Sequence, residues 1–183
     1  DAGIPVYAIR GNHETYTQNL DPKTKKAFPG WYEDQNDTTD WMTFIGGALP
    51  KEFTGDGEAA TPPLEWTGAP AGAKSFALIM HHVASPDDIH WYWVLYNIPP
   101  STSRLEENLP SSPQLPDGSL QGKNSFGKQG YGGPCPPSGT HRYFFRLYAL
   151  DSLLSLSSSA GVKELNQAIQ GHILGSAEFM GTY

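Results

Sequence analysis

The segment with the most chemical potential in this sequence is a loop of glycine and proline that ends in a histidine. Residues 132–143 read Gly-Gly-Pro-Cys-Pro-Pro-Ser-Gly-Thr-His-Arg-Tyr. Glycines let backbone N–H groups turn toward a ligand, and prolines fix the loop and remove competing donors, so the segment suits a rigid cup for an anion. On extended backbone His141 and Tyr143 point to the same side, which brings an imidazole and a phenol to the loop mouth. A stiff turn whose histidine only satisfies the loop backbone is the alternative that this pattern leaves open.

Three apolar strands have to position this loop. Residues 75–82, 91–98 and 143–150 are mostly apolar on both parities, which is typical of strands buried on both faces. Residues 99–140 are rich in Pro, Gly and Ser and show little periodicity, which predicts loops. Apolar residues at helical spacing predict a short C-terminal helix from about residue 162 to 173. The sequence therefore predicts a mainly β domain with a central sheet and one helix.

The first forty residues differ from the rest of the chain. They are polar, they contain several turn signals, and they would form a long irregular segment. Such a loop is uncommon inside a compact domain. We therefore interpret residues 1–40 as an N-terminal arm of uncertain origin and residues 41–183 as the folded domain.

Composition narrows the classes of partner. The 183 residues include 12 Lys and Arg against 19 Asp and Glu, a formal net charge of −7 that disfavours nucleic acid as a partner. No apolar run approaches the roughly 18 residues that a membrane span needs, so the sequence predicts a soluble protein and leaves a cytoplasmic, periplasmic or secreted location open. The single cysteine, Cys135, excludes a framework of internal disulfides.

Several motifs along the chain resemble, in the same order, those of the phosphatidylethanolamine-binding protein family. They are Asp56-Gly-Glu58, Pro62-Pro-Leu-Glu-Trp66, Trp93-Val-Leu-Tyr-Asn-Ile-Pro99, Gly122-Lys-Asn124, Gly130-Tyr131, Gly133-Pro-Cys-Pro-Pro137, His141-Arg-Tyr143 and Leu147-Tyr-Ala-Leu-Asp151. They look most like the bacterial and archaeal, Raf kinase inhibitor-like branch, and the resemblance covers about residues 41–183. It implies a large central antiparallel sheet packed with a smaller sheet, as in a β-sandwich. It also implies a shallow pocket at one end that accepts phosphate-like or other small anions.

The resemblance assigns part of the pocket by position. The family's pocket histidine falls on His141 and its neighbouring aromatic residue on Tyr143, with Gly133 and Pro134 in the loop wall. The other half of the pocket departs from the family. Where the family usually has Asp-Pro-Asp-Ala-Pro, this chain has His81-His-Val-Ala-Ser85, and the second pocket histidine becomes Tyr92.

This departure predicts that His81, in place of a carboxylate, faces His141. His82 is then expected on the opposite face of its strand. Two neighbouring imidazoles can share a proton, bind an anion when charged, or ligate a metal when neutral, and the residue types leave all three open. A metal site of His81, His90 and His141 is one such alternative, and we otherwise expect no cofactor.

We expect a non-catalytic protein that binds a small anionic or phosphorylated ligand with altered specificity. Regulation of a kinase or another protein partner through the same pocket is the alternative that the resemblance allows. A weaker alternative is a metal-dependent phosphoesterase. Residues 11–14, Gly-Asn-His-Glu, resemble a segment of calcineurin-like metallophosphoesterases in which Asn12 and His13 would meet metal ions. Such a centre needs further Asp and His motifs, which this sequence lacks downstream.

Overall fold

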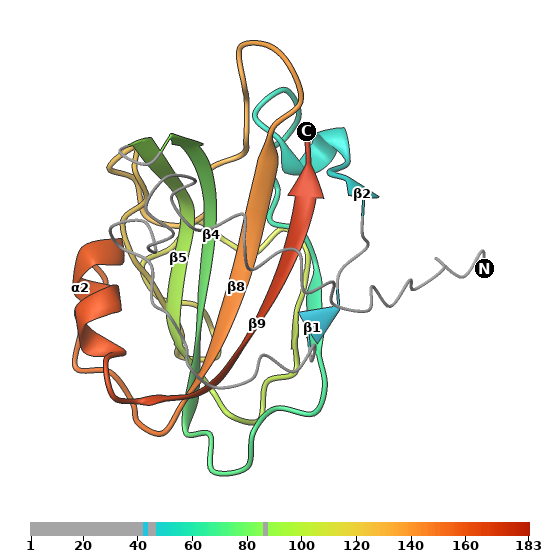
Figure 1. Cartoon of the computed structure of the whole chain (residues 1–183). Coiled ribbons are helices and arrows are strands. Elements are labelled where there is room, and N and C mark those ends of the chain that lie inside the picture. The colour runs from blue at the N-terminus through green and yellow to red at the C-terminus, as the bar shows by residue number, and fades with distance from the viewer. Residues whose placement is uncertain (1–41, 44–46, 86–87) are drawn as a thin grey trace.

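The computed structural model describes residues 42–43, 47–85 and 88–183, and it folds them into two β-sheets and a short helix (Figure 1). The larger sheet has the strand order β2-β9-β8-β4-β5-β7 and the smaller one β1-β3-β6. The strands of the larger sheet are β2 (Gly47–Ala48), β4 (Ser75–Ser85), β5 (Asp88–Ile98), β7 (Leu120–Gln121), β8 (Arg142–Leu150) and β9 (Ile173–Thr182). Those of the smaller sheet are β1 (Met42–Thr43), β3 (Leu64–Trp66) and β6 (Arg104–Leu105). The predicted arm at residues 1–40 and the phosphoesterase-like motif lie outside the described residues.

This architecture confirms the predicted fold class. All strand pairs of the described chain are antiparallel except β2 with β9, which are parallel. The three strands that the apolar runs predict are β4, β5 and β8, and they lie side by side in the sheet. None of the helices in the described part of the chain has the length and apolar character that a membrane crossing requires.

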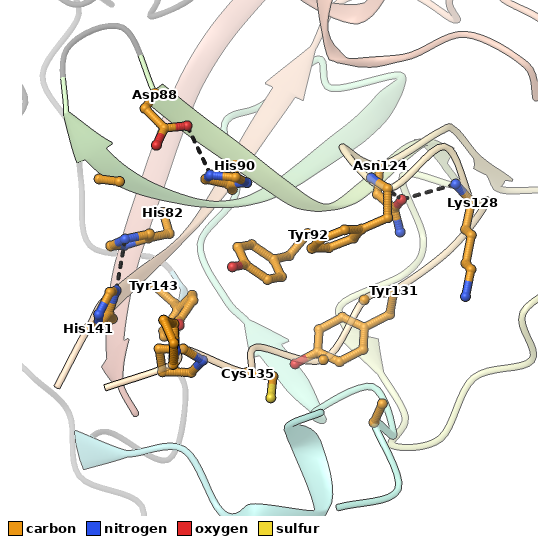
Figure 2. Close-up of a pocket in the computed structure, with 17 residues that line it drawn as sticks. His82, Asp88, His90, Tyr92, Asn124, Lys128, Tyr131, Cys135, His141 and Tyr143 are labelled. Carbon is orange, nitrogen blue, oxygen red and sulfur yellow. Dashed lines mark hydrogen bonds and ion pairs between the residues drawn. The ribbon is translucent and has the colours of Figure 1, made fainter. Parts of the chain in front are cut away.

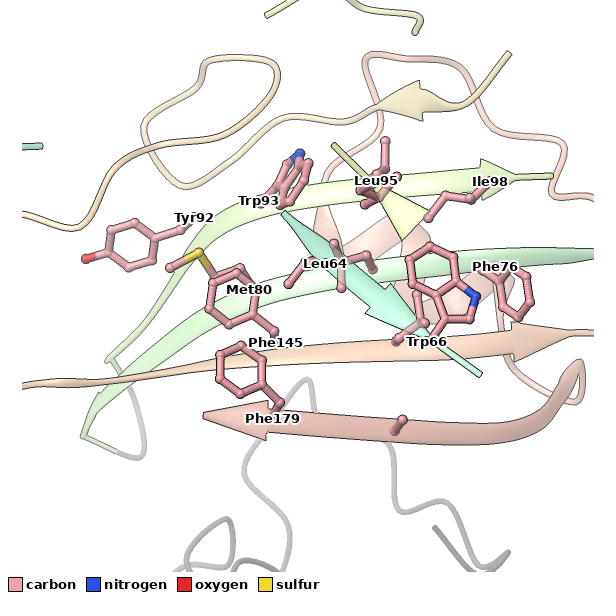
Figure 3. Close-up of a cluster of buried hydrophobic side chains, with 14 of the residues drawn as sticks. Leu64, Trp66, Phe76, Met80, Tyr92, Trp93, Leu95, Ile98, Phe145 and Phe179 are labelled. Carbon is pink, nitrogen blue, oxygen red and sulfur yellow. The ribbon is translucent and has the colours of Figure 1, made fainter. Parts of the chain in front are cut away.

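The larger sheet is covered on both faces, which explains why its central strands are apolar on both parities. Between the two sheets, Phe76 and Met80 of β4 pack with Leu64 and Trp66 of β3 (Figure 3). The edge of the Trp66 ring meets Phe76 with the ring centroids 5.5 Å apart. On the other face, Ala77 and Ile79 of β4 belong to a second core with Leu165 of the helix. Successive residues of β4 thus point alternately into two different cores.

The helix, α2 (Val162–Ala168), is shorter than the predicted range of 162–173. Its first turn is capped by the Glu164 carboxylate, which accepts a hydrogen bond from the Gly161 backbone N–H at 3.0 Å. Leu165 and Ile169 are fully buried against the sheet, as the apolar periodicity predicts. Gly171 then adopts a positive φ of 76°, which turns the chain into β9 at Ile173. The helix prediction was too long because the last apolar residue of the pattern belongs to the strand.

Candidate functional site

A pocket of about 740 Å³ lies where β4 ends and where β5 and β8 begin. Its walls also include the loop at residues 122–137, which crosses the end of the sheet. Figure 2 shows His82, His141, Tyr143 and Tyr92 pointing into the same space, with Lys128 on the far side. The volume is within the range of small-molecule sites in proteins.

Two histidines form the most polar wall of this pocket. His141 Nδ1 lies 3.0 Å from His82 Nε2, and the ring centroids are 4.7 Å apart (Figure 2). His82 Nδ1 donates to the backbone oxygen of Arg142 at 2.8 Å, and His141 Nε2 donates to that of Ser138 at 3.0 Å. All four ring nitrogens are therefore engaged, and the pair is held at both ends by backbone carbonyl groups.

Backbone hydrogen bonds fix the position of His141. Its N–H donates to the Tyr183 carbonyl at 2.7 Å, and the Tyr183 N–H donates to the His141 carbonyl at 3.0 Å. The loop of residues 132–140 thus ends on the C-terminal strand. The imidazole therefore projects from backbone that is paired with the C-terminal residue, and not from a free loop.

The expected contact between His81 and His141 is wrong. His81 is paired in register with Phe144 of β8, so its side chain lies on the α2 side of the sheet, where its ring stacks on Phe144 at 5.4 Å. It is 2% exposed, and burial holds its pKa well below the ordinary value of 6.5. The neighbour His82, expected on the opposite face, is the residue that meets His141. The register of β4 with β8 explains this outcome. His81 pairs with Phe144, so the next residue, His82, lies beside Tyr143 on the other face of the sheet.

The predicted metal set of His81, His90 and His141 is wrong for the same reason, because His81 lies across the sheet from the other two. His90 does line the pocket, where its Nε2 meets Asp88 Oδ1 at 2.9 Å. Both side chains are partly open to solvent at the mouth, with 41% and 58% exposed. Within residues 42–43, 47–85 and 88–183, no three His, Cys, Asp or Glu side chains are grouped closely enough to hold a metal ion.

The structure brings Tyr143 and Tyr92 together, as the sequence predicts. Their rings meet edge to face with centroids 5.3 Å apart. Tyr143 is fully buried, and its hydroxyl has no hydrogen-bond partner of good geometry among the described residues. Burial raises the pKa of both phenols, so each keeps its proton at neutral pH. Tyr143 therefore offers the pocket an O–H donor.

A break in strand pairing gives Tyr92 its direction. Along β5, Trp93 pairs with Met80 and Trp91 with His81, so Tyr92 is an extra residue opposite one peptide of β4. The bulge puts Trp91 on the α2 side and leaves Tyr92 on the pocket side. Simple alternation cannot predict this, because it assumes an unbroken ladder.

The glycine-proline wall is pinned to the segment after the short 3-10 helix η1 (Lys51–Phe53). The Gly55 N–H donates to the Pro134 carbonyl at 2.7 Å. A Cβ on Gly133 would lie 2.6 Å from the Gly55 nitrogen, so only glycine fits there. Gly133 lines the pocket as predicted, whereas Pro134 is buried behind the wall.

The sequence analysis did not predict the opposite wall of the pocket. It used Asn124 and Tyr131 only as parts of family motifs and did not single out Phe126 or Lys128. The Asn124 side-chain oxygen accepts from the backbone N–H groups of Phe126 and Lys128, at 3.0 and 3.1 Å. This arrangement shapes a tight loop that presents Phe126 and Lys128 to the pocket. Tyr131 completes the wall, and its hydroxyl donates to the Phe53 carbonyl at 2.6 Å. An Asn two residues before an exposed aromatic residue and four before a lysine was the available signal.

A sequence model of the phosphatidylethanolamine-binding protein family matches residues 41–183. A UPF0098 protein of Methanothermobacter thermautotrophicus is 51% identical over 137 residues, which cover 75% of this chain and 91% of that protein. A UPF0098 protein of Aquifex aeolicus is 42% identical over 141 residues, covering 75% of this chain and 82% of that protein.

Solved structures show the same similarity. CT736 of Chlamydia trachomatis, described as a phosphatidylethanolamine-binding protein homologue, aligns with a TM-score of 0.68 at 35% identity, over 81% of this chain and 94% of that one. YbcL of E. coli, described as a member of the mammalian PEBP family, aligns with a TM-score of 0.72 at 28% identity, over 78% of this chain and 96% of that one. The family match at residues 41–183 includes every strand of the two sheets that the structure describes.

Proposed function

This chain belongs to the phosphatidylethanolamine-binding protein family, in its bacterial and archaeal form, and from this premise we propose that its pocket binds a small anionic or phosphorylated molecule without transforming it. The observation that carries the proposal is the arrangement of His82 and His141 beside the Tyr143 hydroxyl. A histidine pair can hold positive charge, and a buried hydroxyl whose contact with Tyr92 is not a hydrogen bond of good geometry gains one when an anion binds.

Local charge supports an anion despite the formal net charge of −7. Lys128 lines the pocket opposite the histidine pair. The one carboxylate on the pocket wall, within the described ranges, belongs to Asp88, which is paired with His90. The pocket therefore offers more donors and cations than acceptors to a small ligand.

The groups on the pocket wall favour binding over catalysis. Cys135 is the only thiol of the chain, and its hydrogen bond to the neighbouring Asp56 carboxylate raises its pKa. A raised pKa keeps the sulfur protonated and weakens it as a nucleophile. The ring nitrogens of the histidine pair are engaged with each other and with backbone oxygens, which leaves neither ring ready as a general base.

Binding of phosphate and cacodylate tests this proposal. We expect electron density for the anion beside His141 in soaked crystals, and saturable heat in calorimetric titration. A His141→Ala variant should lose at least about tenfold in affinity, because it removes one ring of the pair whose positive charge attracts the anion. The matched control is His172→Ala, because His172 is also a partly exposed histidine but pairs with Asp151 and does not line the pocket. Equal affinity of the parent and His141→Ala for every anion would refute the proposal.

A protein partner that docks on the same mouth is the second candidate, and one observation favours it. Phe126 is 53% exposed on the pocket rim, and exposed aromatic side chains are enriched where proteins associate. A kinase or other partner captured by the parent chain and not by Phe126→Ser would support this candidate. Capture that is unaffected by the substitution would place the contact elsewhere.

A further inference from the structure

We infer that His82 and His141 share three ring protons, so that the pair carries one positive charge and the pocket selects a monoanion as its counter-ion. This inference rests on the proposed function and specifies the charge of the ligand. It also predicts that binding is coupled to the protonation of the pair.

The count of protons follows from the partners of the four ring nitrogens. The two outer partners are the backbone oxygens of Arg142 and Ser138, which only accept hydrogen bonds. His82 Nδ1 and His141 Nε2 must therefore each carry a hydrogen. The two inner nitrogens are 3.0 Å apart, and two lone pairs facing each other at this distance would repel, so one further proton lies between them. Three protons on two rings make one neutral imidazole and one imidazolium.

The difference in burial between the two rings indicates which one is neutral. His82 is 9% exposed, and burial, which disfavours the charged ring, is the largest cause of its lowered pKa. His141 lies nearer the mouth, beside the exposed loop residue Ser138. We therefore assign the neutral ring to His82 and the imidazolium to His141.

No acid in direct contact balances this charge among the residues that the structure describes. The titratable or charged groups around the pair are Asp88, His90 and Tyr92 of β5, Arg142 and Tyr143 of β8, Lys128 and Cys135 of the pocket loop, and Tyr183 at the end of the chain. The Asp88 carboxylate bonds to His90, and it acts on His82 through its charge without touching the ring. Each ring nitrogen of the pair bonds to the other ring or to a carbonyl oxygen. The counter-ion position is therefore left to a ligand.

Since every ring nitrogen is already bonded, the anion needs another donor near the charge. The Tyr143 hydroxyl is such a donor: its ring lies 5.3 Å from the His82 ring, and within the described chain the hydroxyl has no partner of good geometry. The Tyr143 O–H holds the anion, and the pair attracts it electrostatically. A single compensating charge suits a carboxylate or a phosphodiester better than a dianion.

The test uses dimethyl phosphate, which remains a monoanion from pH 5 to pH 9, in calorimetric titrations of the full chain. We expect the affinity to fall about tenfold per pH unit above the pH at which the pair loses its third proton, with uptake of up to about one proton per anion there. His141→Gln, which removes the imidazolium, should bind weakly and without this slope. His172→Gln must keep the slope, because His172 pairs with Asp151 and does not line the pocket.

A second measurement needs no ligand. Nitrogen-15 spectra of the imidazole rings report which nitrogens carry hydrogen, and we expect three protonated nitrogens in the pair over the pH range in which the anion binds. Binding of dimethyl phosphate to a pair with two protons, or with an affinity independent of pH, would overturn this inference and leave the proposed function standing. A pair with three protons that binds no anion would refute the proposed function instead.

Discussion

His81 and His82 are neighbours on β4, yet they lie in two different environments. His81 is sealed on the α2 side between Phe144 and Trp91, with ring centroids 5.4 Å from each. His82 lies at the rim of the pocket and is bonded to His141. The face of the strand, and not the residue type, decides which imidazole is part of the core and which is part of a site.

The causes of the pKa shifts also differ between the two histidines. The pKa of His81 is lowered well below 6.5, first by burial and then by the charge of Arg146. The pKa of His82 is also lowered by burial, but its hydrogen bond to the Arg142 carbonyl acts in the opposite direction. The α2 face therefore disfavours a charged His81, whose neighbour Arg146 is already cationic, whereas a hydrogen bond on the pocket face favours a charged His82.

The largest expected effect comes from placing a permanent charge on each face. His81→Lys should lower the free energy of unfolding by about 3–5 kcal/mol, because an ammonium group buried without a counter-charge is among the costliest changes to a protein interior. Arg146 on the same face adds repulsion. Urea unfolding at pH 7.5 measures this loss.

His82→Lys is the matched control on the pocket face. Its ammonium group can extend into the water of the pocket, so we expect a loss of about 1–2 kcal/mol, which reflects mainly the missing hydrogen bond to His141. Similar losses for the two variants would contradict the contrast between the faces.

Acid should destabilise the fold through the sealed histidine. In the unfolded chain His81 binds a proton near its ordinary pKa of 6.5, whereas in the folded chain its pKa is well below this value. Stability is therefore constant above about pH 6.5 and falls as the pH is lowered, by up to about 1.4 kcal/mol per pH unit for this one group. His82 contributes with the same sign, because its folded pKa is also lowered. We expect a loss of about 2 kcal/mol between pH 6.5 and pH 5, measured by urea unfolding.

His81→Phe should flatten this pH profile, since a phenyl ring fills similar space and does not titrate. A profile that stays as steep in His81→Phe would assign the acid sensitivity to other groups. The pKa shift of His81 would then no longer distinguish the α2 face from the pocket face.

Two tyrosines on opposite faces separate stability from binding. Tyr143→Phe removes a hydroxyl without a good partner in the described chain, so stability should change by less than about 1 kcal/mol while anion affinity falls about tenfold. Tyr96 points to the α2 side, and its hydroxyl donates to the Ser157 carbonyl. Tyr96→Phe should therefore cost about 1 kcal/mol of stability and leave anion affinity unchanged.

Calorimetric titration and urea unfolding of both variants check this pair of expectations. A loss of anion affinity in Tyr96→Phe, or an unchanged affinity in Tyr143→Phe, would show that the Tyr143 hydroxyl does not hold the anion.

The fold class could be predicted from the sequence because its three central strands are long apolar segments. β4, β5 and β8 fall where the runs predict them, and their double-sided burial follows from the two cores. The helix boundary was wrong by several residues, since a tight turn at Gly171 interrupts a pattern that periodicity alone continues.

The site was predictable only in part. His141 and Tyr143 follow from alternation within one strand, so their common side could be predicted. The choice between His81 and His82 depends on register with β8, and the direction of Tyr92 depends on a bulge in β5. Register and bulges arise from pairing between distant segments, which no local pattern contains.

The smallest expected effect concerns the thiol on the pocket wall. The Cys135 sulfur lies 3.4 Å from Asp56 Oδ1, and Asp56 Oδ2 accepts a hydrogen bond from the Tyr183 hydroxyl at 2.7 Å. The carboxylate raises the pKa of the thiol through this hydrogen bond and through its charge. Asp56→Asn removes the charge, so the thiolate fraction at pH 7.5 should rise and alkylation by iodoacetamide should become roughly two to three times faster.

Asp117→Asn is the control, because Asp117 does not line the pocket and accepts instead from the Ser119 backbone N–H. Its alkylation rate should equal that of the parent, and saturating dimethyl phosphate should slow alkylation in every variant by covering the pocket. If Asp56→Asn reacts no faster than the parent, water screens charges on the pocket face almost completely. The difference between the two faces would then come from solvent access alone.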